Sequence, residues 1–165
     1  MTLKWSAALG AVAAAAALLL LTPGTALARG HGGGEVYGSF STGVFTTSFQ
    51  MRQYSADPHD VSGYVRAHPG PPGTPILENI GARGHVTCIH IEGNRVGVIY
   101  SIDQGSEPPF IRGQVIYAAA VDNHGHGPDE SGFIGGPPGL FSDCRPDIVP
   151  MMPVLDGHVT IREHR

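Results

Sequence analysis

Residues 84–102, GHVTCIHIEGNRVGVIYSI, contain two runs of alternating apolar residues on either side of Gly93-Asn94. A Gly and an Asn between two such runs are a strong signal for a β-hairpin with a two-residue turn, because both residues tolerate the positive φ angles of tight hairpin turns. The stretch therefore predicts an antiparallel hairpin as the centre of the fold.

A two-residue turn also sets the register of the hairpin, and alternation along each strand then sorts the side chains onto two faces. The expected pairs are Glu92 with Arg95, Ile91 with Val96, His90 with Gly97, Ile89 with Val98, Cys88 with Ile99 and Thr87 with Tyr100. The expected core face consists of Thr87, Ile89, Ile91, Val96, Val98, Tyr100 and Ile102. The opposite face carries Val86, Cys88 and Ile99, so another segment is expected to cover Cys88.

Other short runs with period-two alternation predict further strands. These lie at residues 36–40, 44–54, 61–67, 110–121 and 131–134, with an edge segment at 76–80 and a closing strand around Val159 and Ile161. Gly- and Pro-rich stretches separate them, and no segment after residue 28 shows a helical pattern. The pattern predicts an all-β fold, a single antiparallel β sandwich or barrel with Gly/Pro-rich loops over residues 36–165.

The first 28 residues have the features of a secretory signal peptide. Lys4 precedes an Ala/Leu-rich apolar core, and Ala26-Leu27-Ala28 matches the small-residue cleavage pattern. We expect cleavage after Ala28, a flexible lead over residues 29–35, and a secreted, extracellular or cell-envelope protein. The alternative, an uncleaved anchor, would require a longer apolar core of about 20 residues.

The charge balance is acidic, with ten basic and fourteen acidic residues and a formal net charge of −4. Lys4 is the one lysine, so the predicted mature chain has only arginine as a basic residue. Scattered arginines in an acidic chain argue against a nucleic-acid partner, which requires a concentrated basic surface. The expected partner is therefore extracellular or part of the cell envelope, with no membrane span after signal cleavage.

The two cysteines, Cys88 and Cys144, predict one disulfide in an exported chain. The bridge would close a loop of 56 residues, for which the chain-entropy relation gives about 4 kcal/mol of stabilisation. The alternative is a pair of catalytic or metal-binding thiols, but neither cysteine lies in a C-x-x-C pair.

Two places are candidate metal sites. After cleavage, the terminus Arg29-Gly30-His31 would offer an amine, two peptide nitrogens and an imidazole, a square-planar set that suits Cu(II) or Ni(II). The second candidate is the 122–129 loop, with possible ligands Asp122, Asn123, His124, His126 and Asp129. Its oxygens suit Ca²⁺ and its imidazoles suit Zn²⁺. The alternative is structural, because Asp and Asn side chains bind the backbone of tight loops.

Several short blocks of the chain resemble a family of small secreted single-domain β proteins of unknown function from high-GC Gram-positive bacteria. The blocks are residues 84–88 (GHVTC), 92–95 (EGNR), 121–123 (VDN) with 127–129 (GPD), 143–144 (DC) and 157–161 (GHVTI). The resemblance covers about half of the predicted mature chain. It implies an exported β domain and supports the disulfide, but it supplies no catalytic residue.

No enzyme motif is present in the sequence: there is no nucleophile elbow, zinc-protease helix, phosphate loop or dinucleotide fingerprint. We therefore expect no catalytic residue and no cofactor. The expected function is a non-enzymatic binding or structural module. The alternatives are a metal-binding module and, third, a hydrolase whose carboxylates meet only in the fold.

Overall fold

The computed structural model describes residues 32–43, 45–70, 81–104, 111–147 and 149–164. Within these residues the chain forms β-strands and no helix, which confirms the all-β prediction. The strands are β1 (Gly34–Ser41), β2 (Phe45–Gln53), β3 (Val61–Pro69), β4 (Ala82–Glu92), β5 (Arg95–Gln104), β6 (Val115–Val121), β7 (Glu130–Gly136), β8 (Met152–Pro153) and β9 (Asp156–Glu163). The predicted signal peptide, residues 29–31 and the edge segment 76–80 lie outside the described residues.

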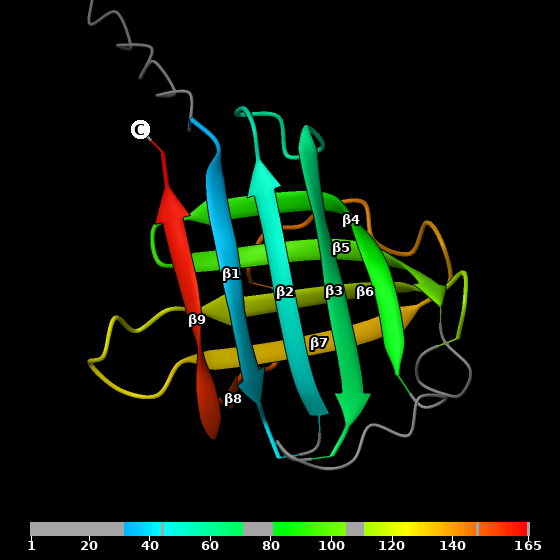
Figure 1. Cartoon of the computed structure of the whole chain (residues 1–165). Coiled ribbons are helices and arrows are strands. Elements are labelled where there is room, and N and C mark those ends of the chain that lie inside the picture. The colour runs from blue at the N-terminus through cyan, green and yellow to red at the C-terminus, as the bar shows by residue number, and fades with distance from the viewer. Residues whose placement is uncertain (1–31, 44, 71–80, 105–110, 148, 165) are drawn as a thin grey trace, which may run out of the picture.

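All nine strands belong to one antiparallel sheet with the order β8-β7-β6-β5-β4-β3-β2-β1-β9. Strands β1 to β8 therefore follow one another across the sheet, and β9 returns to pair with β1. Figure 1 shows the sheet curling so that β9, β1, β2 and β3 cross in front of β4 to β7. The predicted sandwich or barrel is thus a single curled sheet, a half-barrel.

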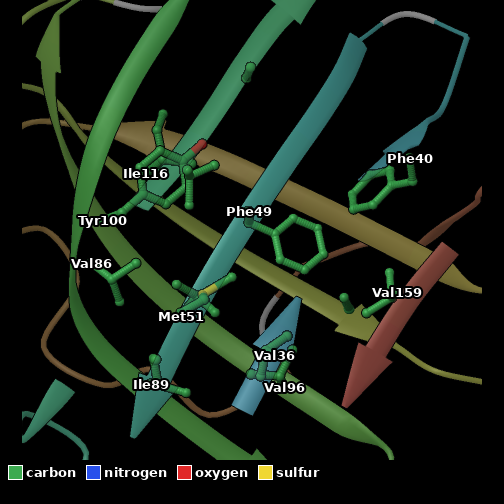
Figure 2. Close-up of a cluster of buried hydrophobic side chains, with 14 of the residues drawn as sticks. Val36, Phe40, Phe49, Met51, Val86, Ile89, Val96, Tyr100, Ile116 and Val159 are labelled. Carbon is green, nitrogen blue, oxygen red and sulfur yellow. The ribbon is translucent and has the colours of Figure 1, made fainter. Parts of the chain in front are cut away.

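The main core lies between the two halves of this curled sheet. Alternation along β2 turns Phe49 and Met51 inward, whereas Gln50 and Arg52 are exposed. Figure 2 shows both inward side chains among residues of β1, β4, β5, β6 and β9. Full burial of an aliphatic or aromatic side chain contributes about 1.5–3 kcal/mol, so this core holds the two halves together.

The central hairpin, β4 and β5, has the predicted register from its turn as far as Cys88. Glu92 pairs with Arg95, and each following pair is as predicted to Cys88 with Ile99. Gly93 has a φ of 61°, whereas Asn94 is not among the described residues with positive φ. This combination is typical of a type II′ turn, in which only the first central residue needs positive φ.

A β-bulge at Thr87 makes the next predicted pair wrong. Val86, not Thr87, pairs with Tyr100, and the register shifts between Val86 and Cys88. The extra residue of a bulge reverses the alternation beyond it, so Val86 enters the main core and Thr87 is exposed. The loop between β2 and β3 binds the backbone next to the bulge. There the Ile89 N–H donates a hydrogen bond to the Pro58 carbonyl, at 2.8 Å.

Strand β6 is shorter than the predicted strand over residues 110–121. It begins at Val115, because residues 111–114 form a turn in which the Gln114 N–H donates to the Ile111 carbonyl and Gly113 has a φ of 85°. Ile111 is consequently exposed rather than part of the strand face. Tyr117 and Ala119 share one face of β6 as predicted.

The predicted Cys88–Cys144 disulfide is present, with 6.1 Å between the two Cα atoms. It joins β4 to the segment after β7 on the outer face of the hairpin. A second, smaller core surrounds it, with Cys88, Ile99, Tyr117, Ala119, Cys144 and Val149 buried. Gly97 allows this close approach, since a Cβ atom there would overlap the Cys144 carbonyl.

Candidate functional site

The 122–129 loop connects β6 to β7, and its two aspartates accept hydrogen bonds from backbone groups. Asp122 Oδ1 accepts the N–H of His124 at 2.8 Å, and Asp122 Oδ2 accepts that of Ile161 at 3.1 Å. Asp129 Oδ1 accepts the N–H of Asn123 at 2.9 Å, and Asp129 Oδ2 accepts that of Val159 at 2.7 Å. Each of the four carboxylate oxygens thus has a backbone donor.

The donors Val159 and Ile161 lie in β9, which is the end strand of the sheet and pairs on its other side with β1. The two carboxylates therefore bind the open edge of β9 and tie it to the β6–β7 connection. Charged acceptors make stronger hydrogen bonds than neutral ones. On this side of the half-barrel, hydrogen bonds to the two aspartate side chains take the place of pairing with a further strand.

The predicted metal ligands of this loop are arranged around the same carboxylates. His124 Nδ1 lies 3.0 Å from Asp122 Oδ1, whereas His126 is exposed, and the Asn123 amide donates to the Pro128 carbonyl. No group of three or more His, Cys, Asp or Glu side chains is positioned to hold a metal ion within the described ranges. The hydrogen bonds to the backbone explain the two carboxylates of this loop as structural groups. Binding of Ca²⁺ or Zn²⁺ there stays a prediction.

A second feature lies on the outer surface of β9, β1, β2, β3 and β4, whose first four strands are in front in Figure 1. We call it the tyrosine–arginine face. It consists of Tyr37, Gln50, Arg52, Tyr54, Tyr64, Arg66, Arg83 and Arg162. These residues lie at outward positions of their strands, and a direct cross-strand row runs from Tyr37 through Gln50 and Tyr64 to His85.

Each arginine of this face lies over a tyrosine ring. The guanidinium carbon of Arg52 is 5.3 Å from the Tyr54 ring centroid, and that of Arg162 is 5.4 Å from the Tyr37 centroid. Tyr64 is approached by two arginines: Arg66 at 5.4 Å and Arg83 at 5.9 Å. Cation–π contacts of this kind contribute about 0.5–1 kcal/mol at exposed sites, and they hold the guanidinium groups in place on the sheet.

Positive charge on this face is largely uncompensated. Arg66 and Arg83 are direct cross-strand partners, an arrangement in which like charges destabilise a sheet. Glu35 lies between two of the arginines: it is 3.6 Å from Arg52 and is the direct cross-strand partner of Arg162. In the part of the chain that the structure describes, Arg66, Arg83 and Arg162 have no carboxylate within ion-pair distance.

A shallow hollow of about 320 Å³ lies in the middle of the tyrosine–arginine face. Tyr37, Tyr54 and Tyr64 form parts of its wall, together with Gln50, Arg52 and the acidic Glu35. Small-molecule sites in proteins typically have volumes upward of about 300 Å³, so the hollow has room for a ring-sized ligand group.

The main core also contains a small cavity of about 50 Å³. The side-chain hydroxyl of Thr42, which lines it, is buried and has no hydrogen-bond partner within the described residues. Such a volume has room for a few water molecules and is far below the ~150 Å³ of a cavity that admits benzene. We therefore interpret it as a gap in packing, not as a ligand site.

Sequence reasoning missed the tyrosine–arginine face. Its arginines are spread from residue 52 to residue 162, so they look scattered along the chain. The available signal was local: Arg52 and Tyr54, like Tyr64 and Arg66, are two residues apart and therefore share a strand face. That these strands are neighbours, with β9 returning beside β1, depends on the fold.

Comparison with known proteins adds no assignment, since the chain matches no protein-family model, no curated protein and no solved structure. The function has to be inferred from the geometry. The described residues contain no helix long and apolar enough to cross a membrane.

Proposed function

We propose that this protein is a secreted, extracytoplasmic binding module without enzymatic activity, and that it holds an anionic ligand on the tyrosine–arginine face. The observation that carries the proposal is the Arg66–Arg83 cross-strand pair, which has no carboxylate partner in the described residues. A cross-strand pair of like charges lowers the stability of a sheet, so we expect such a pair where the two charges serve binding.

The charge distribution of the molecule supports this proposal. The chain as a whole carries a formal charge of −4, yet this face gathers four exposed arginines, with Glu35 in register between Arg52 and Arg162. A guanidinium group presents N–H donors in a planar fork that matches carboxylate, sulfate and phosphate oxygens. The face is thus complementary to a negatively charged partner.

The location is proposed on two observations. The Cys88–Cys144 bridge is typical of proteins from oxidising compartments, and the first 28 residues have the pattern of a signal peptide. Both favour a ligand that is found outside the cytoplasm.

Binding of the purified protein to immobilised dextran sulfate, with neutral dextran as the matched control, tests the proposal. We expect retention on dextran sulfate alone, weakening as salt is raised because salt screens exposed charges. Replacing both paired arginines, Arg66→Gln with Arg83→Gln, should weaken binding at least tenfold, whereas Arg112→Gln with Arg145→Gln, on exposed residues elsewhere, should change it less than twofold.

Two results would contradict the proposal: no retention on dextran sulfate, or an equal loss in the two double variants. The thermal midpoint of unfolding serves as the folding control. We expect the Arg66→Gln, Arg83→Gln variant to have a midpoint close to that of the parent, because it removes a like-charge pair but also two cation–π contacts to Tyr64.

A further inference from the structure

The ligand class of the tyrosine–arginine face follows from the side chains that lie between its arginines, on the basis of the proposed function. We infer that the face binds an acidic polysaccharide, with uronate carboxylates held by the arginines and a sugar ring in the hollow between them. Three observations support this inference: the distance between the arginines, the polar groups that lie between them, and the guanidinium groups that cover the tyrosine rings.

The arginines lie at two separate positions on the face: Arg52 lines one end of the hollow, and Arg66 lies beyond its other end. Arg52 is paired with Ser62 in the register of β2 and β3, and Arg66 follows Ser62 by four residues along β3. At about 3.4 Å per residue, the two rows are separated by roughly 13–14 Å. One small anion cannot engage both positions at once, whereas a polymer with repeated charges can.

The space between the two positions carries uncharged hydrogen-bonding groups, with one carboxylate, Glu35, at the Arg52 end of the hollow. Gln50 is exposed and lies directly between Tyr37 and Tyr64 in adjacent strands. Exposed Ser39 and Ser62 lie in neighbouring rows. Amide and hydroxyl side chains both donate and accept hydrogen bonds, which suits the many hydroxyl groups of a sugar.

Single-stranded nucleic acid fits the same face less well. Proteins that bind it stack successive bases on aromatic rings, but here each of Tyr37, Tyr54 and Tyr64 has at least one guanidinium group over its ring at 5.3–5.9 Å. The groups that the face presents are therefore guanidinium forks, which bind a planar carboxylate through two parallel hydrogen bonds.

The test first compares polygalacturonate with its fully methyl-esterified form, in which the carboxylates are neutral. It then compares polygalacturonate with single-stranded DNA and with inorganic polyphosphate, each at the same concentration of negative charge. We expect polygalacturonate to bind at least tenfold more tightly than each of the other three. A uronate trisaccharide should compete with the polymer, whereas the monosaccharide should not, because it cannot reach both anion positions.

Two variants separate sugar recognition from charge alone. Gln50→Ala and Tyr64→Leu should both weaken polygalacturonate binding at least fivefold. Gln50→Ala, which leaves the contacts between the arginines and Tyr64 intact, should keep retention on dextran sulfate within twofold. The control variant is Leu155→Ala, at a residue that is 68% exposed, lies between β8 and β9 and does not belong to the face, and thermal unfolding is measured for all variants.

The outcomes distinguish the inference from the proposed function. Equal or tighter binding of DNA or polyphosphate, or no loss in the Gln50→Ala and Tyr64→Leu variants, overturns the polysaccharide inference and leaves anion binding in place. Failure to bind any of the charged polymers, dextran sulfate included, overturns both.

Discussion

Asp122 and Asp129 each connect two parts of the backbone that are far apart in the sequence. Each carboxylate accepts one N–H from its own loop and one from β9. The Asp122 side chain is only 9% exposed, so water cannot readily replace its bonds. A buried donor left without a partner costs about 1–3 kcal/mol.

Replacing Asp122 with Ala should therefore lower the free energy of unfolding by about 2–4 kcal/mol. Chemical denaturation measures this loss, and hydrogen exchange should show faster exchange of the Ile161 amide. The matched control is Asp156→Ala, which removes an exposed carboxylate at the start of β9 and should change stability by less than about 0.5 kcal/mol. Equal stability of the two variants would mean that the carboxylate does not hold β9.

Tyr100 is a buried polar side chain of a different kind. It is 5% exposed in the main core, and its hydroxyl has no hydrogen-bond partner within the described residues. Burial raises the pKa of the Tyr100 phenol above its usual value. The folded protein therefore keeps the Tyr100 proton at pH values where the unfolded chain loses it, and stability at this residue falls as the pH rises above about 10.

The Tyr100→Phe variant should remove this alkaline loss. We expect the parent to lose up to about 1.4 kcal/mol per pH unit above pH 10 through this group, and the variant to lose correspondingly less. Denaturation at pH 8, 10 and 11 measures the difference, with Tyr54→Phe as the control because Tyr54 is 55% exposed. Parallel stability curves for parent and Tyr100→Phe would refute the assignment.

At the scale of elements, local sequence patterns predicted most of the strands. The register of the hairpin near its turn follows from Gly93-Asn94 and alternation alone, and it was predicted correctly as far as Cys88. The bulge at Thr87 was not predictable in this way, because it depends on a distant loop whose Pro58 carbonyl accepts the Ile89 N–H. Alternation within one strand predicts which side chains share a face of the sheet. It does not predict an extra residue, such as this bulge, that another segment stabilises.

The segment after β7 depends on the Cys88–Cys144 bridge for its position. Its described residues form no regular strand between Gly136 and Met152. It contacts β6 through the Tyr117 hydroxyl, which donates to the Arg145 carbonyl, and the hairpin through the small core around the disulfide and through Arg95, which pairs with Asp147 at 3.1 Å.

The double variant Cys88→Ser, Cys144→Ser should accordingly lose up to about 4 kcal/mol of stability, the chain-entropy value for a loop of this length. Hydrogen exchange should increase mainly in the segment that follows β7. Thermal unfolding of the oxidised parent, the reduced parent and the variant provides the comparison. Reduction should have no effect on the variant, and an unchanged midpoint in all three would show that the bridge does not stabilise the fold.

At the scale of the whole molecule, the tyrosine–arginine face depends on strand order, which the sequence patterns do not contain. The return of β9 beside β1 brings Arg162 next to strands that carry Tyr37 and Arg52. In the sequence the arginines look scattered, and the 122–129 loop is a candidate metal site. The fold reverses that ranking, since the loop acids are occupied by the backbone and the arginines are gathered and exposed.

The closure by Asp122 and Asp129 also affects how this protein meets other protein chains. A free strand edge with open N–H groups is a template on which another β-strand can add, leading to aggregation. Here the Val159 and Ile161 N–H groups already have carboxylate partners, and at the opposite end of the sheet β8 has only two residues, one of them Pro153. The β9 edge is therefore protected against the addition of a further strand, so the exposed outer surface of β9, β1, β2 and β3 ends at an edge that does not invite self-assembly.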